Sequence, residues 1–214
     1  MLSSSCKKND NKNPPKTGTV TDIEGNIYVT VKIGNQWWMA ENLRATRFND
    51  STPIPLVTDS AAWGKFATPA CCYYNNDASG NKKVYGPLYN WYAVKTGKLA
   101  PAGWHVPTLE EWNILVDNYF GYTWAGEYLR EEGNIHWNAS LSMANNKSGF
   151  TALPGGEREN DGSFYGLHNR GGFWSSTTSG DVTVKVLLLR YDNIGVDFID
   201  YHKFCGLSVR CIKD

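Results

Sequence analysis

Residues 103–112, "GWHVPTLEEW", place a histidine close to two glutamates. An imidazole beside a carboxylate is the pairing that general acid–base catalysis uses, so His105, Glu110 and Glu111 are the first candidates for chemistry. The same segment also fits a structural role. Thr108 and Glu111 form the T-x-x-E pattern of a capping box, in which hydroxyl and carboxylate each accept from an unpaired backbone N–H at a helix start.

The residues around this pattern favour helix initiation over catalysis. Pro107 biases the residue before it towards extended backbone, and both glutamates lie where the positive end of a helix dipole stabilises acids. Apolar residues then recur at helical spacing and form one face: Leu109, Trp112, Leu115, Val116 and Tyr119. The local sequence specifies no partner carboxylate for His105, so we expect a structural or surface histidine and no catalytic residue here.

Other catalytic and metal-binding patterns are absent from the sequence. It contains no G-x-S-x-G, C-x-x-C or H-E-x-x-H motif, and its four histidines are scattered. Glycosidases act through a pair of carboxylates, and any chain with 21 acidic residues contains such pairs. Glycosidases are therefore the one enzyme class that the residue types leave open. The sequence therefore predicts a protein that is not an enzyme and has no dedicated metal site.

Composition narrows the class of protein further. Formal net charge is zero, so no strongly basic face is expected and nucleic acid is not a predicted partner. Nine tryptophans with 21 glycines in 214 residues are typical of a turn-rich fold that contains β-strands. The sequence holds no apolar stretch long enough to span a membrane.

Hydrophobic periodicity places helices in the middle of the chain and strands at both ends. From Ile27 to Ile33 the apolar residues alternate, and turn signals at residues 24–26 and 34–35 make this a β-meander. Residues 51–70 read as loop with one helical turn. The apolar residues 85–94 fit either a buried helix or a strand, and we favour a short helix. We also expect a short helix at residues 124–131, and closing strands at 172–177, 182–191, 195–201 and 206–212. This order predicts an α+β fold.

The first residues resemble the end of a bacterial lipoprotein signal. Small residues precede Cys6, and a polar run with Lys, Asn and Pro follows it. In such signals the cysteine becomes the lipidated first residue, although the apolar segment that normally precedes it is not present here. We therefore expect residues 1–17 to be a signal remnant and flexible tether, lipidated at Cys6, that anchors an outer-membrane lipoprotein of the cell envelope.

Seven motifs in order carry a family resemblance: "GNIYVTVKIGNQWWMAENL", "CYYNND", "YGPLYNWYAV", "GWHVPTLEEW", "GFTALPGGER", "GFWSST" and "GLSVRCIKD". They resemble the Fibrobacter succinogenes major paralogous domain, which occurs in surface lipoproteins of Bacteroidetes and related bacteria. The resemblance covers residues 17–214. It implies that residues 18–214 form a single C-type-lectin-like domain, in the branch shared with formylglycine-generating enzymes, with two or three short helices packed on irregular antiparallel sheets.

The resemblance also bears on the cysteines. Family members often carry a cysteine where this chain has Ala100, and that cysteine pairs with the one in the last strand, so Cys211 lacks its expected partner. Cys205 is roughly 20 Å from Cys211 along an extended chain, at about 3.3 Å per residue, which is too far for a disulfide. Cys71 and Cys72 point to opposite faces of an extended segment. We expect at most one disulfide, between Cys72 and either Cys205 or Cys211.

Two activities of related folds can be compared with the residues. Formylglycine-generating enzymes bind copper through two closely spaced reactive cysteines upstream of the closing strand, where this chain has Cys205 alone. C-type-lectin-like domains often bind calcium through loop oxygens. Such oxygens occur at Glu157, Glu159, Asn160 and Asp161, but Asn-Asp-Gly is also a turn sequence, and the E-P-N, Q-P-D and W-N-D patterns of calcium-dependent lectins are absent. We favour the turn and predict no cofactor, with calcium as the alternative.

The expected function is recognition or adhesion at the cell surface, with an extracellular glycan or a surface protein as partner. The alternatives are a structural module without a small ligand and an enzyme of unknown reaction. In C-type-lectin-like folds the long loops bind ligands, which here corresponds to residues 134–176. The ligand-binding candidates in this region are Trp137, Glu157, Arg158, Tyr165, His168 and Trp174. Arg158 and Tyr165 are expected to be exposed, whereas the two tryptophans are also candidates for the core.

Overall fold

The computed structural model describes residues 15–139 and 144–214, so the predicted lipidation site Cys6 and most of the predicted tether lie outside the described residues. The helices are α1 (Ser60–Trp63), α2 (Ala78–Asn81), α3 (Trp91–Lys95), α4 (Leu109–Asp117) and α5 (Ala125–Leu129), with one 3₁₀ turn, η1 (Tyr74–Asn76). None of the helices in these two ranges has the length and apolar character needed to cross a bilayer.

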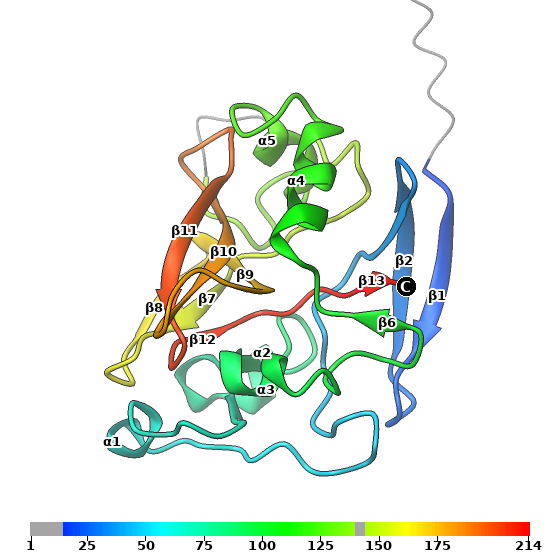
Figure 1. Cartoon of the computed structure of the whole chain (residues 1–214). Helices are drawn as coiled ribbons and strands as arrows, with labels where there is room; N and C mark the ends of the chain where they lie inside the picture. Colours follow the sequence, from blue (N-terminus) through cyan, green and yellow to red (C-terminus); the bar gives the residue numbers. More distant parts are fainter. Residues whose placement is uncertain (1–14, 140–143) are drawn as a thin grey trace, which may run out of the picture.

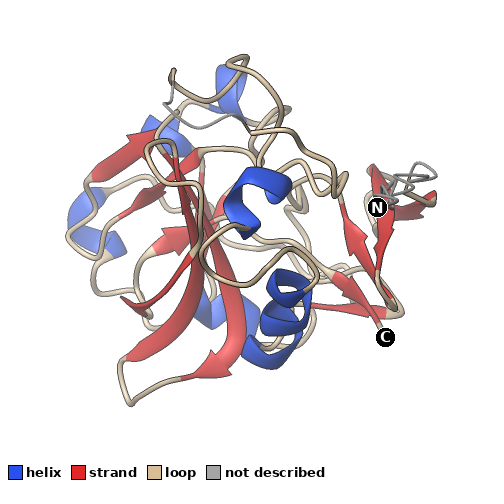
Figure 2. Ribbon diagram, turned by 90° about the horizontal axis from the view of Figure 1, so that it is seen from above, coloured by secondary structure: helices blue, strands red, loops and turns tan. Residues whose placement is uncertain are grey.

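The strands form two sheets. The smaller has the order β1 (Thr17–Thr21), β2 (Ile27–Ile33), β3 (Gln36–Met39), β13 (Ile212–Lys213) and β6 (Trp104–His105). The larger has the order β11 (Asp197–His202), β10 (Thr183–Arg190), β9 (Arg170–Thr178), β7 (Gly155–Arg158), β12 (Gly206–Leu207), β5 (Leu88–Asn90) and β4 (Cys71–Cys72), with β8 (Phe164–Leu167) paired to β7. The two sheets lie on opposite sides of the molecule (Figures 1 and 2).

The mixed fold with mostly sheet agrees with the predicted class, but two details were wrong. Five α-helices are described instead of two or three. The single turn α1 lies within residues 51–70, where one helical turn is predicted, whereas α2 was missed because four residues are too short to give a periodic pattern. The sheets are also not purely antiparallel, since β7 runs parallel to β9. The chain reverses twice, through β8, before β9 returns beside β7.

Helix α4 begins as its sequence predicts. The Thr108 hydroxyl accepts from the Glu111 backbone N–H, and the Glu111 carboxylate accepts from that of Thr108. Trp112 is fully buried and stacks on Trp38 with 4.7 Å between ring centroids. Its indole N–H donates to the carbonyl of Trp174, which ties the helix to β9.

Residues 85–94, predicted as a helix, instead divide into β5 and α3, with Asn90 capping the helix through its side chain. The alternating pattern in β2 is also only half correct. Ile27 and Val29 are exposed, whereas Tyr28 between them is buried in the main apolar cluster, and its phenol donates to Asp22 at 2.6 Å. Beyond Thr30 the apolar residues face the core as expected.

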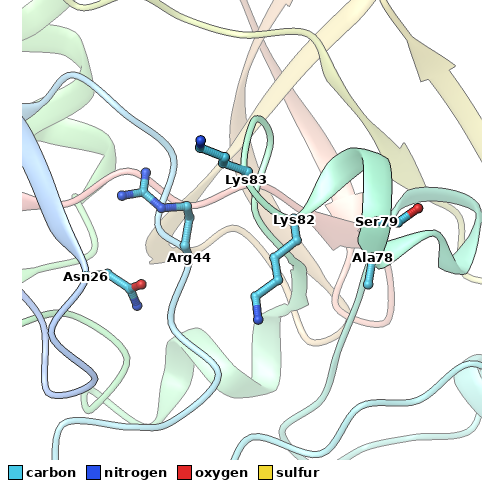
Figure 3. Close-up of a pocket in the computed structure, with 6 residues that line it drawn as sticks. All are labelled: Asn26, Arg44, Ala78, Ser79, Lys82 and Lys83. Carbon is cyan, nitrogen blue, oxygen red and sulfur yellow. The ribbon is translucent and has the colours of Figure 1, made fainter.

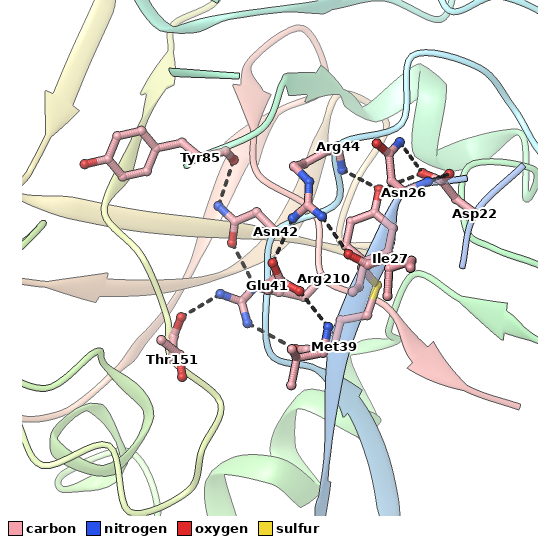
Figure 4. Close-up of polar contacts among 12 residues, drawn as sticks. Asp22, Asn26, Ile27, Met39, Glu41, Asn42, Arg44, Tyr85, Thr151 and Arg210 are labelled. Atoms are coloured by element: carbon pink, nitrogen blue, oxygen red, sulfur yellow. Dashed lines mark hydrogen bonds and ion pairs between the residues drawn. The ribbon is translucent and has the colours of Figure 1, made fainter. Parts of the chain in front are cut away.

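The last segment of the chain joins the two sheets, running from β12 in the larger sheet to β13 in the smaller one (Figure 1). Arg210 lies fully buried in this crossing. Its guanidinium donates to the Asn42 side chain and to the carbonyls of Met39, Phe150 and Thr151, at 2.6–3.0 Å (Figure 4). Burial lowers the pKa of Arg210 to about 9, and these oxygens offset part of the cost of burying the charge.

The four described cysteines are free and buried, so the predicted disulfide of Cys72 with Cys205 or Cys211 was wrong. Cys71 and Cys72 do point to opposite sides of β4. This places Cys71 in the same apolar cluster as Cys205 and Cys211, whereas Cys72 belongs to a separate cluster around Trp63 and Leu88. Burial raises the pKa of Cys71 and of Cys205 to about 12, which keeps both thiols protonated and unreactive.

The start of α4 yields a stability test. We expect Thr108→Ala to lower the free energy of unfolding by about 1 kcal/mol through loss of the cap. Trp112→Ala removes a fully buried ring and should cost about 3–5 kcal/mol. Urea melts of both variants beside the unaltered chain measure the difference. Equal stability of Trp112→Ala and the unaltered chain would contradict the packing described for α4.

Candidate ligand-recognition cleft

Four of the six predicted ligand-binding residues are buried. Trp137 and Trp174 belong to the core, and their indole N–H groups donate to the carbonyls of Ala152 and Tyr89. Glu157 is fully buried beneath the surface. These three side chains are therefore placed to support a site and not to contact a ligand in it.

The expectation that Arg158 is exposed was wrong. It is fully buried, and its guanidinium donates to the carbonyls of Val57, Thr58 and Gly162. Its cationic carbon also lies 4.4 Å from the Trp63 ring centroid. The arginine is needed inside because the carbonyls of the loop before α1 have no strand to pair with.

The other two predicted residues, Tyr165 and His168, are at the surface. Tyr165, on β8, is 54% exposed and lines a cleft of about 270 Å³. The other lining residues come from the start of β9 and the end of β10: Asn169, Arg170, Arg190, Tyr191 and Asp192. His168 lies beside this cleft in the turn before Asn169, with its ring Nδ1 2.7 Å from the His136 carbonyl oxygen.

Arg170 is held in the cleft from two sides. One guanidinium nitrogen donates to buried Glu157 at 3.0 Å, and Tyr201 donates its hydroxyl to the same carboxylate. The guanidinium carbon also lies 4.6 Å from the centroid of the Tyr165 ring. Glu157 therefore orients Arg170, and Arg170 in turn supports the exposed Tyr165 ring.

These contacts leave the Glu157 carboxyl in a balance of opposing effects. Burial raises its pKa above the ordinary value, whereas the hydrogen bond from Tyr201 and the charge of Arg170 lower it in part. For Arg170, burial lowers the pKa, but the charge of Glu157 and the contacts with Tyr201 and Tyr165 together outweigh burial, so the net shift is upward. The guanidinium is thus charged in the cleft.

Arg190 lies directly across the β9–β10 ladder from Arg170. Two like charges in register are unfavourable, so the pair needs acidic neighbours. Arg190 has two such neighbours, the carboxylates of Asp197 at 3.3 Å and of Asp192 at 3.9 Å. Arg170 has the buried Glu157 carboxylate.

The backbone of the cleft is fixed from below. Buried Arg130 donates to the carbonyls of Arg190 and Tyr191 at 2.8 and 3.0 Å, and the Tyr191 N–H donates to the Asn169 carbonyl. The cleft is therefore an open polar surface on a rigid frame. Its exposed ring can stack on an apolar face of a ligand, while Asn169 and the arginines can bond to hydroxyl groups.

Sequence reasoning missed five of the six lining residues, although a signal for them exists. Residues 172–177 and 182–191 were both predicted as strands. Antiparallel pairing of such neighbours places the start of the first beside the end of the second. That rule places Arg170, just before the first of these strands, next to Arg190 and the polar residues 191–193 ("YDN") at the end of the second.

The calcium candidates form a turn. Asp161 accepts from the backbone N–H and the hydroxyl of Ser163, and these bonds lower its pKa. Glu157 is occupied by Arg170, and the Glu159 backbone N–H bonds across the turn to the Ser163 carbonyl. In the two described ranges, no three His, Cys, Asp or Glu side chains are grouped so as to hold a metal ion.

His105 has two carboxylate partners, although the local sequence specified none. Its Nδ1 lies 2.6 Å from Asp214 and its Nε2 2.9 Å from Glu111, so the histidine joins the capping box of α4 to the end of the smaller sheet. Burial alone would lower its pKa, but the hydrogen bonds to Asp214 and Glu111 outweigh burial and raise it. Both ring nitrogens are thus engaged by carboxylates of the fold itself.

The His105 contacts predict a pH-dependent contribution to stability. A histidine whose pKa is raised by folding stabilises the fold fully below its unfolded pKa of about 6.5, and this contribution is lost as pH rises through the folded pKa. His105→Gln should therefore destabilise the chain more at about pH 5.5 than at about pH 9. Urea melts of both proteins at both values test this. A difference between the two proteins that does not change with pH would show that His105 is not protonated between its partners.

Comparisons with known proteins place the chain in a family. Neither the search of curated proteins nor that of solved structures gave a match. A family model does match, over residues 31–213, which includes the larger sheet, all five described helices and every residue of the cleft, and leaves out β1 and the start of β2 in the smaller sheet. The chain therefore belongs to the Fibrobacter succinogenes major domain family.

Proposed function

We propose that this chain is a non-catalytic recognition domain of the bacterial cell surface that binds a neutral glycan in the cleft around Tyr165. The observation that carries the proposal is the exposed Tyr165 ring, supported from behind by Arg170 in a cleft with polar walls. A sugar ring offers an apolar face to stack on an aromatic ring and hydroxyl groups to bond to the surrounding side chains.

The charges in the cleft favour a neutral ligand over an acidic one. Arg170 is paired with Glu157, and Arg190 is shared between Asp192 and Asp197. The two cations are thus matched by carboxylates, so an anion would gain little attraction there. Their remaining N–H groups are still available as directional donors to hydroxyl oxygens.

The proposal extends to fold and location. A C-type-lectin-like arrangement fits the irregular segment between the middle helices and the last strands, which includes β8 with Tyr165 and the turn with Asn169. An envelope lipoprotein anchored through Cys6 fits the polar run that follows this cysteine. In that arrangement the tether leads into β1, in the smaller sheet, whereas the cleft belongs to the larger sheet.

A glycan array probed with residues 15–214 tests the binding function. A neutral glycan should be retained, and Tyr165→Ala should weaken its binding by roughly tenfold, since a stacked aromatic ring contributes about 0.5–1.5 kcal/mol beyond the area it buries. Tyr122→Ala is the matched control, because Tyr122 is 52% exposed and lies outside the cleft. Calorimetry on the three proteins measures the affinities.

Two outcomes of the glycan experiment would contradict the proposal. If no neutral glycan is retained, a structural surface module becomes the better description. If Tyr165→Ala and Tyr122→Ala bind with the affinity of the unaltered chain, the glycan site lies elsewhere.

The anchor requires a separate experiment with a complete secretion signal ahead of Cys6. We expect the protein to incorporate labelled fatty acid and to fractionate with membranes, and Cys6→Ala to abolish both, because the thiol is the acylated group. Cys205→Ala is the control, since that buried thiol should not be acylated. Unchanged membrane association of Cys6→Ala would contradict a lipid anchor at this position.

A further inference from the structure

A second cavity, of about 280 Å³, lies at the junction of three segments that are distant in sequence. It is lined by Asn26 in the turn before β2, by Arg44 in the loop after β3, and by Ala78, Ser79, Lys82 and Lys83 in and after α2. Arg44 lies between Asn26 on one side and the two lysines on the other (Figure 3). No residue of the first cleft contributes to this cavity.

The cavity is lined by three cations and no carboxylate. Arg44 is paired with Glu41 at 3.0 Å, but within residues 15–139 and 144–214 neither Lys82 nor Lys83 has an acidic partner within 4.0 Å. Three cations and the single carboxylate paired with them, that of Glu41, therefore leave the cavity with two uncompensated positive charges. This is a local excess in a chain whose formal net charge is zero.

Arg44 is held in place before any ligand binds. Besides Glu41, its guanidinium donates to the Ile27 carbonyl at 2.8 Å and lies over the Tyr28 ring at 4.4 Å (Figure 4). These contacts use two of its five N–H groups. The remaining donors can bond to an oxyanion without a large loss of side-chain entropy.

The backbone that carries the cations is equally constrained. The Asn42 side chain donates to the Tyr85 carbonyl at 3.0 Å and accepts from buried Arg210 (Figure 4). Gly86 has φ +70°, and a Cβ there would lie 2.4 Å from the Leu43 carbonyl oxygen. Only glycine allows the segment after Lys83 to approach the Arg44 loop this closely.

From these observations we infer that the cavity is a binding site for a tetrahedral oxyanion with two negative charges, such as the phosphate group of a phosphate monoester. Two uncompensated cations match the charge of a phosphate monoester at neutral pH. Lysine ammonium groups bind phosphate as point charges, and the fixed guanidinium adds directional bonds. The site is separate from the proposed glycan cleft, so the two proposals succeed or fail independently.

The test is an NMR titration of residues 15–214 with inorganic phosphate at constant ionic strength. We expect saturable shifts of the backbone amide signals of Arg44 and of residues 78–83. The double variant Lys82→Gln/Lys83→Gln should raise the apparent Kd about tenfold or abolish the shifts, as expected for the loss of two exposed charge contacts. Both lysines are exposed, so the variant should keep its fold, which its amide spectrum verifies.

The matched control is Lys65→Gln/Lys147→Gln, which makes the same change in net charge at two exposed lysines outside the cavity. It should bind phosphate like the unaltered chain. Shifts that do not saturate, or that are equal in all three proteins, would overturn the proposal by showing general charge attraction. A sugar phosphate as a second probe identifies the source of the group: tighter binding than inorganic phosphate indicates a sugar-borne phosphate, and equal binding indicates the free ion.

Discussion

Hydrogen bonds from buried arginines to backbone carbonyls hold this fold together. Much of the chain is loop, and buried carbonyls outside helices and strands need other donors. Arg210, Arg158 and Arg130 provide them. Arg158 reaches the Val57 carbonyl across 101 residues, and Arg210 reaches that of Met39 across 171. A guanidinium suits this role because its five donors diverge in one plane and can serve several segments at once.

Such a buried cation is costly to remove from water, and the cost explains the close geometry around it. Arg210 also packs against the rings of Phe150 and Phe173, with its cationic carbon 4.7 and 5.5 Å from their centroids. The aromatic faces and carbonyl oxygens together replace the lost hydration. Each arginine thus fixes the loops around it in one arrangement, because any other arrangement leaves its donors unpaired.

Both surface cavities depend on this buried frame. Arg130 positions the carbonyls of Arg190 and Tyr191 under the cleft around Tyr165, and Arg210 positions Asn42, which in turn holds the loop behind Lys83. The residues that line the cavities are largely exposed, whereas those that set their shape are buried. Exposed lining residues such as Tyr165, Lys82 and Lys83 can therefore be exchanged with little effect on stability. Changes at Arg170, which is paired with buried Glu157, or in the frame should disturb both fold and binding.

The sequence by itself determined the features that depend on neighbours in the chain. The capping box at Thr108 and Glu111 joins residues three apart, and its consequence, the helix with Trp112 on its buried face, is as predicted. Three of the four predicted closing strands are recognisable for the same reason, since alternation is a local pattern. Residues 206–212, predicted as one strand, instead divide into β12 in the larger sheet and β13 in the smaller one. The family resemblance is confirmed as well, because it rests on short motifs in a fixed order.

The tertiary structure decided which polar residues are inside and which side chains meet. Arg158 is buried because loop carbonyls about a hundred residues away need a donor, and His105 gains Asp214 only when β13 pairs with β6. The cleft likewise needs the register that places Arg170 opposite Arg190. Local patterns fix local hydrogen bonds, but burial and long-range pairing depend on which distant segments pack together, and no short stretch of sequence contains that information.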